Sequence, residues 1–133
     1  MRTKKSCYVG HEGRELELML AGKKPLSMFY DGADEKESVI PEDEFDPFVK
    51  NGQFAKGTEI FERALDPRTG KPYRIEYVLY ALKEEEWRIR AMFLVLRTLM
   101  GMAKADEGID RITGSLLGYS DEENDQYIAS RHR

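Results

Sequence analysis

The stretch TEIFERAL-DPRTGKP-YRIEYVLYAL, from Thr58 to Leu82, decides the fold of this chain. Two runs rich in β-branched and aromatic residues, Thr58 to Leu65 and Tyr73 to Leu82, flank a loop with two prolines and a glycine. Such runs separated by turn residues are typical of an antiparallel hairpin with a longer loop. Alternate residues of a strand share a face, so the second run has one apolar face, formed by Tyr73, Ile75, Tyr77, Leu79 and Ala81, and one mixed face.

The segment after the hairpin, Trp87 to Lys104, is predicted to be a helix. Glu84, Glu85 and Glu86 place negative charge where a helix N-terminus favours it. Helical spacing then relates the members of one apolar stripe: Ile89, Met92, Phe93, Leu96, Leu99, Met100 and Ala103. The alternation over 87–90 also permits a strand from Trp87 to Leu96, but the stripe continues through several turns, which favours the helix.

Shorter elements are predicted on both sides of this core. Glu12 to Ala21 is predicted to be a helix that ends at Gly22, and Leu26 to Tyr30 a short strand that ends at a turn, Asp31-Gly32. Residues 31–38 form an acidic loop that we expect to be mobile. A further helix begins after Pro41 and is interrupted or restarted at Asp46-Pro47.

The C-terminal part, residues 106–131, is predicted to be a pair of helices. Gly118 closes the first helix, and Ser120 with Glu123 has the spacing of a capping box at the start of the second. The expected fold is therefore α+β. A small antiparallel sheet, made of the central hairpin and one short strand, packs against a long helix, with flanking N- and C-terminal helices. We expect one domain over 1–133, with residues 1–6 a flexible basic N-terminus.

Composition limits the class of protein. The chain has 133 residues, of which 41% are hydrophobic and 35% charged, enough for a core inside a solvated shell. The net charge of −4 argues against a nucleic-acid partner, as do the acids Asp121, Glu122 and Glu123 at the start of the last helix. No apolar run is long enough to span a bilayer, so no membrane partner is expected. The single cysteine, Cys7, excludes an internal disulfide and predicts a cytoplasmic protein.

No catalytic or cofactor motif is present in the sequence. It has no phosphate-binding Gly-Lys-Ser/Thr, no dinucleotide fingerprint and no nucleophile elbow. Cys7 and His11 form the one close thiol–imidazole pair, which could be a nucleophile or half of a metal site. A structural zinc site needs four ligands, and the remaining histidine is the distant His132. We therefore expect no cofactor and no metal, and regard Cys7 and His11 as structural residues.

The predicted long helix has a second apolar side. Trp87, Ala91, Leu94 and Met102 lie nearly opposite the core stripe, and a basic row at heptad spacing, Arg90, Arg97 and Lys104, runs beside them. A helix that is apolar on two sides is either covered by its own chain, here the C-terminal helices, or covered by a partner or a second copy. Large apolar patches seldom stay exposed.

These features predict a non-enzymatic interaction protein of the inhibitor, immunity or regulator type. Aromatic and arginine residues dominate protein-binding sites, and the candidates here are Trp87, Arg90, Leu94, Arg97, Tyr73 and Tyr77. The partner would be another protein or a second copy of the chain. Two alternatives remain: a small enzyme with a site near Cys7 and His11, and an RNA-binding module that uses Arg90, Arg97 and Lys104.

Overall fold

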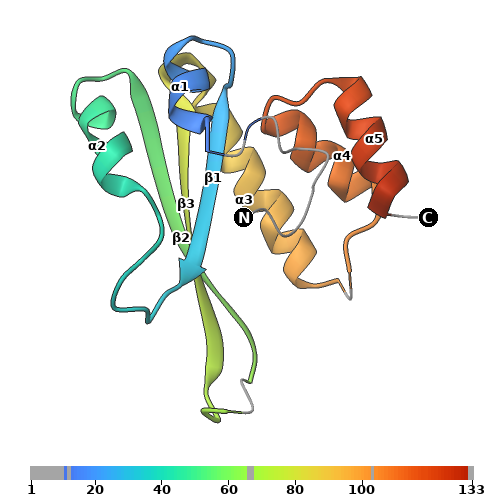
Figure 1. Ribbon diagram of the computed structural model, residues 1–133. Helices are drawn as coiled ribbons and strands as arrows, with labels where there is room; N and C mark the ends of the chain where they lie inside the picture. The colour runs from blue at the N-terminus through green and yellow to red at the C-terminus, as the bar shows by residue number, and fades with distance from the viewer. Residues whose placement is uncertain (1–10, 12, 66–67, 103, 132–133) are drawn as a thin grey trace.

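The computed structural model describes residues 11, 13–65, 68–102 and 104–131 (Figure 1). Its elements, in chain order, are α1 (Glu15–Leu20), β1 (Leu26–Gly32), α2 (Glu42–Lys50), β2 (Phe54–Leu65), β3 (Pro72–Leu82), a short 3-10 turn η1 (Lys83–Glu85), α3 (Trp87–Met100), α4 (Glu107–Leu116) and α5 (Asp121–Arg131). The predicted α+β class, with a small antiparallel sheet, a long helix and flanking helices, is confirmed.

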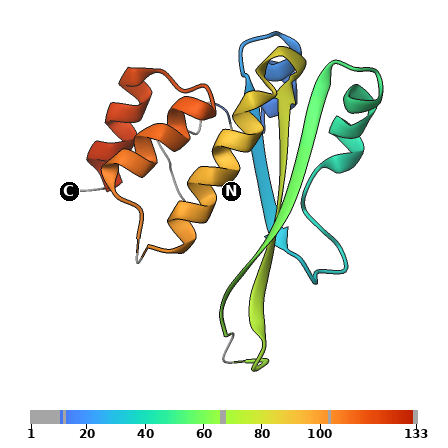
Figure 2. The same cartoon turned by 180° about the vertical axis from the view of Figure 1, so that it is seen from behind.

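The sheet has three strands in the order β1-β3-β2, all antiparallel, so β3 is central and β2 is an edge strand. β1 pairs with β3 from Leu26↔Ala81 to Gly32↔Ile75, and β2 pairs with β3 from Phe54↔Leu82. The hairpin formed by β2 and β3 extends past the helices as a twisted ribbon (Figures 1 and 2).

Each face of the sheet is covered by helices. The face that includes Leu79 and Ala81 packs against α3, whose buried residues are Ile89, Met92, Phe93 and Leu96. The opposite face, predicted to be mixed, is also apolar near α1 and α2, where Val78 and Tyr80 pack with Met19, Ile40, Phe45 and Phe54. The sheet is therefore the middle layer between α3 and the pair α1 and α2 (Figure 2).

Several predicted boundaries were wrong by a few residues. β1 continues through Asp31 and Gly32, because β3 is long enough to pair with both of them. The carboxylate of Asp31 then accepts hydrogen bonds from the amides of Gly32 (2.8 Å) and Val39 (2.9 Å), so this residue belongs to the strand and also fixes the loop behind it. α3 ends at Met100 and not at Lys104, since Gly101 follows as its C-cap.

α2 is continuous, although the sequence favoured an interruption at Asp46-Pro47. Pro47 lies inside the helix and removes one backbone donor. The helix persists because Phe45 and Phe48, on either side of Pro47, pack on Phe54 of the sheet with ring centroids 6.2 and 5.4 Å from it. The segment 1–6, predicted to be a flexible N-terminus, lies outside the described residues.

α4 and α5 form a hairpin against the flank of α3 (Figure 1). The predicted capping box is present: the Ser120 amide donates to Glu123 Oε1 (2.8 Å) and the Glu123 amide donates to Ser120 Oγ (3.1 Å). Gly118, with φ of +95°, makes the turn, and a Cβ there would lie 2.4 Å from Cδ of Pro25. The turn between α4 and α5 thus packs directly on the segment that leads into β1.

Candidate functional site

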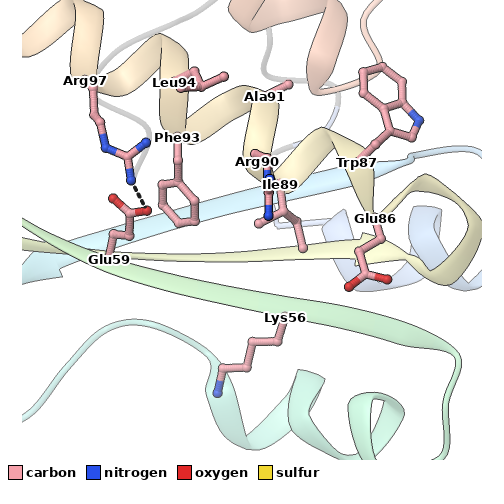
Figure 3. A pocket seen from close by; sticks show the side chains of 10 residues that line it. All are labelled: Lys56, Glu59, Glu86, Trp87, Ile89, Arg90, Ala91, Phe93, Leu94 and Arg97. Carbon is pink, nitrogen blue, oxygen red and sulfur yellow. Dashed lines mark hydrogen bonds and ion pairs between the residues drawn. The ribbon is translucent and has the colours of Figure 1, made fainter.

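A groove of about 920 Å³ lies along the outer side of α3, above the edge strand β2 (Figure 3). It is lined by residues of β2, of α3 and of the turn that joins β3 to α3: Lys56, Glu59, Glu86, Trp87, Ile89, Arg90, Ala91, Phe93, Leu94 and Arg97. Four of the six binding residues predicted from the sequence are in this set. They are Trp87, Arg90, Leu94 and Arg97. We call this feature the α3 groove.

The apolar side chains of the α3 groove divide into two groups. Ile89 and Phe93 point toward the sheet and are buried, whereas Ala91 and Leu94 point away from it (Figure 3). Leu94 keeps 56% of its surface exposed and Trp87 keeps 58%. Trp87 and Leu94 are seven residues apart, close to two helical turns, so both lie on the same side of α3. Of the four residues predicted for the second apolar side, Trp87 and Leu94 are exposed, Ala91 is partly buried against the core, and Met102 lies beyond the end of α3.

The C-terminal helices cover only one flank of α3. Arg88 reaches across this flank and its Nη1 donates to the carbonyl oxygens of Ser115 (3.1 Å) and Leu116 (3.2 Å) at the end of α4. Val95 and Leu99, which lie on the same side as Arg88, are partly buried against the core. This contact fixes α4 beside α3. The guanidinium of Arg88 also lies over the ring of Trp87, 4.7 Å from its centroid, but Trp87 and Leu94 each remain more than half exposed.

The charges of the α3 groove are mostly paired. Arg97 donates to Glu59 of β2, and Glu86 lies 3.6 Å from Lys83 Nζ. Lys56 points toward α2, where its Nζ donates to Glu42 Oε2 (2.8 Å) and Asp46 Oδ1 (2.9 Å) (Figure 3). Arg90 is exposed and forms no hydrogen bond or ion pair with any residue that the structure describes.

Two predicted binding residues lie elsewhere. Tyr77 is only 8% exposed, and its ring packs edge-on against Phe61 at 5.5 Å in the core beneath α3. Tyr73 lies toward the tip of the hairpin, in a separate hollow of about 360 Å³ that Asp34 and Arg74 also line. The strand–helix crossing does not bring either tyrosine to Trp87.

The predicted Cys7–His11 site is only partly described. Cys7 lies outside the described residues. The ring of His11 stacks on Tyr119, with centroids 3.9 Å apart, and its Nδ1 accepts a hydrogen bond from Lys24. Burial and the neighbouring Lys24 charge lower the pKa of His11 to about 4, so the imidazole is neutral at pH 7. These contacts give His11 a structural role between α1, β1 and the turn before α5.

Three other kinds of site, for a metal ion, a membrane and RNA, were also considered in the part of the chain that the structure describes. No group of three or more His, Cys, Asp or Glu side chains there could hold a metal ion. No described helix is long and apolar enough to cross a membrane. Of the basic row considered for RNA, Arg97 is already paired with Glu59, and Lys104 lies beyond the end of α3.

Sequence reasoning missed two residues that shape the α3 groove. Glu59 was assigned only to a strand, although its carboxylate fixes Arg97 across the groove. Gly57 brings β2 close to α3: a Cβ at this position would lie 2.5 Å from Ile89 Cγ2 and 3.3 Å from Phe93 Cε2. A glycine inside a strand is the signal that could have indicated a close approach.

Comparison with known proteins gives no relative for this chain: no family model, no curated protein and no solved structure matches it.

Proposed function

We propose that this protein binds another protein, and that the α3 groove is its binding surface. The exposure of Trp87 and Leu94 on one side of a helix carries this proposal. Covering both side chains removes apolar surface from water, worth about 25 cal/mol per Å². Tryptophan and arginine are among the residue types enriched in protein-binding hot spots, and Trp87 and Arg90 both line the groove. The groove supplies these residue types on a regular helix, whose backbone needs no reordering when a partner binds.

A non-enzymatic role agrees with this site. The groove holds Arg90, Arg97, Lys56 and two glutamates, but four of these five charges are engaged in ion pairs. The site therefore supports recognition rather than proton transfer, because most of its charged groups already have a partner within the chain.

A photo-cross-linking experiment tests where the partner binds. A photoreactive amino acid is placed at position 94 and, as a matched control, at position 112, since Ile112 on α4 is 49% exposed and lies outside the groove. Both proteins are expressed in the native host and irradiated. We expect a discrete adduct from position 94 and none from position 112.

The cross-linked partner is then purified for binding measurements. Leu94→Arg is expected to weaken binding at least about 100-fold, because it places a charge on an apolar contact. Ile112→Arg should bind like the wild type. Both variants should keep the wild-type circular dichroism spectrum and melting temperature to within a few degrees. Equal affinity of the two folded variants would contradict the α3 groove as the binding surface.

A further inference from the structure

Arg90 and Arg97 occupy equivalent places on α3 but differ in what faces them. They are seven residues apart, so they lie on the same side of the helix, toward β2. Arg97 binds the carboxylate of Glu59 on β2. Arg90, nearer the start of the helix, forms no ion pair with any residue of the described chain.

The difference follows from the backbone of β2. Gly57 precedes Glu59 by two residues, so both face α3. At Gly57 the strand approaches α3 so closely that even a Cβ would overlap Ile89. Gly57 therefore offers no side chain to α3, and the preceding residue on this face of β2, Ala55, is uncharged and buried in the core. The part of β2 that packs under the start of α3 thus supplies no carboxylate for Arg90, as Glu59 does for Arg97.

No other acid of the groove replaces the missing partner. Glu86 lies beside Lys83, and Glu59 is engaged by Arg97. Lys56 binds Glu42 and Asp46 on the far side of β2. Arg90 thus adds a positive charge next to the exposed apolar side chains of Trp87 and Leu94.

A partner that covers Trp87 and Leu94 also removes water from Arg90. A desolvated guanidinium without an acceptor is strongly unfavourable, whereas one bound to a carboxylate forms short, charge-assisted hydrogen bonds. Charge complementarity therefore defines the occupant: a segment that is apolar where it meets the exposed side of α3 and acidic where it meets Arg90.

We propose that the α3 groove recognises a protein segment that places an apolar side chain on Trp87 and Leu94 and an Asp or Glu carboxylate on Arg90. This inference rests on the proposed function, because it specifies the chemistry of the partner at the same site. Glu59 already fills this role for Arg97 within the chain, and the partner's acid would do so for Arg90.

A library of random unphosphorylated peptides displayed on phage is the probe. It is selected on the 133-residue chain and counter-selected on Leu94→Arg, so that only peptides bound at the groove are kept. We expect the enriched peptides to combine an aromatic or aliphatic residue with an Asp or Glu at a constant spacing. Synthetic copies are then measured by fluorescence anisotropy, each beside a version in which the acid is replaced by its amide.

The expected pattern is a coupling between the peptide acid and Arg90. The amide version should bind the wild type about 10-fold more weakly, as for loss of a charge-assisted hydrogen bond. It should bind Arg90→Ala no more weakly than the acid version does. Arg90→Glu should prefer a peptide with Lys at the acid position. Lys23→Glu, the same charge change at an exposed residue near β1, should behave as the wild type.

Two failures are distinguishable. Groove-dependent peptides that bind wild type and Arg90→Ala equally, or that lack an acid, would overturn the carboxylate inference and leave the α3 groove as a binding surface. Absence of any peptide that distinguishes wild type from Leu94→Arg would overturn both proposals.

Discussion

The Nζ atom of Lys24 lies 2.9 Å from Nδ1 of His11, so a lysine that is only 2% exposed donates a hydrogen bond to a neutral imidazole. Nζ also donates to the carbonyl oxygen of Leu117, again at 2.9 Å. Burial lowers the pKa of Lys24 to about 8, although the charges of Glu15 and Glu123 act in the opposite direction. The contact joins the start of β1 to the turn between α4 and α5.

The buried amine predicts how stability depends on pH. In the unfolded chain Lys24 keeps a pKa near 10.5, so the folded state binds fewer protons between about pH 8 and 10.5. The contribution of Lys24 to the free energy of unfolding should therefore rise with pH across this window, by at most about 3 kcal/mol. Urea unfolding of wild type and Lys24→Met at pH 8, 9 and 10 gives the free energy of unfolding of each protein, and their difference measures this contribution. The difference between the two proteins cancels the other titrating groups, and a constant difference would contradict the prediction.

Leu94 and Leu96 provide a matched pair on α3. Leu94 is exposed, whereas Leu96 is 3% exposed in the core beneath the helix. Leu96→Ala should destabilise the fold by about 2–5 kcal/mol, because it leaves a cavity. Leu94→Ala should change stability by less than about 0.5 kcal/mol, as most surface substitutions do. Chemical denaturation compares them, and similar losses would mean that Leu94 is covered by its own chain.

A side chain at position 57 should destabilise the fold. Gly57→Ala places a Cβ against Ile89 and Phe93 and should cost about 1–3 kcal/mol, as overpacking of a core does. The double variant Gly57→Ala with Ile89→Ala should lose less than the sum of the two single changes, because the smaller side chain at 89 makes room. Thermal unfolding of the three variants tests this coupling, and simple additivity would place the strain elsewhere.

Asp46 fixes α2 on the sheet through two donors. The hydroxyl of the buried Tyr80 donates to Asp46 Oδ1 (2.7 Å), and Lys56 Nζ donates to the same atom (2.9 Å). Burial raises the pKa of Tyr80, and its hydrogen bond to Asp46 raises it further, so the phenol stays protonated as a donor.

Asp46→Ala leaves this hydroxyl without its acceptor and should cost about 1–3 kcal/mol. In the background of Tyr80→Phe the same substitution should cost less, because the hydroxyl is absent. A double-mutant cycle of the free energies of unfolding gives the coupling. A coupling near zero would show that the hydrogen bond contributes nothing to stability.

The sequence predicted those parts of the fold that depend on local signals. The antiparallel pairing of β2 with β3, the apolar stripe of α3 and the Ser120–Glu123 capping box each lie within a short window of sequence. Trp87, Arg90, Leu94 and Arg97 all line the α3 groove, and helical periodicity relates these four positions within one short segment.

Features that depend on long-range packing could not be predicted from the sequence. The run Gly22-Lys23-Lys24-Pro25 gives no local sign that Lys24 is buried, because its partners include Leu117, 93 residues later in the chain. Tyr73 and Tyr77 lie on β3, close to Trp87 in sequence. Helix α3 crosses the sheet near Gly57 of β2, which pairs with Leu79 of β3. The helix therefore does not pass near Tyr73. Residue spacing cannot give the point where α3 crosses the sheet, nor show that Arg90 has no ion-pair partner among the described residues.

The strand order β1-β3-β2 also constrains how the chain can assemble. Of the three strands β3 is the last to leave the ribosome, and both of the others hydrogen-bond to it, so the sheet can begin to form only when β3, which starts at Pro72, emerges. β2 then finds its neighbour across a short loop, whereas β1 must wait for a partner more than forty residues downstream. We therefore expect the β2–β3 hairpin to form first and the N-terminal third of the protein to pack on it afterwards.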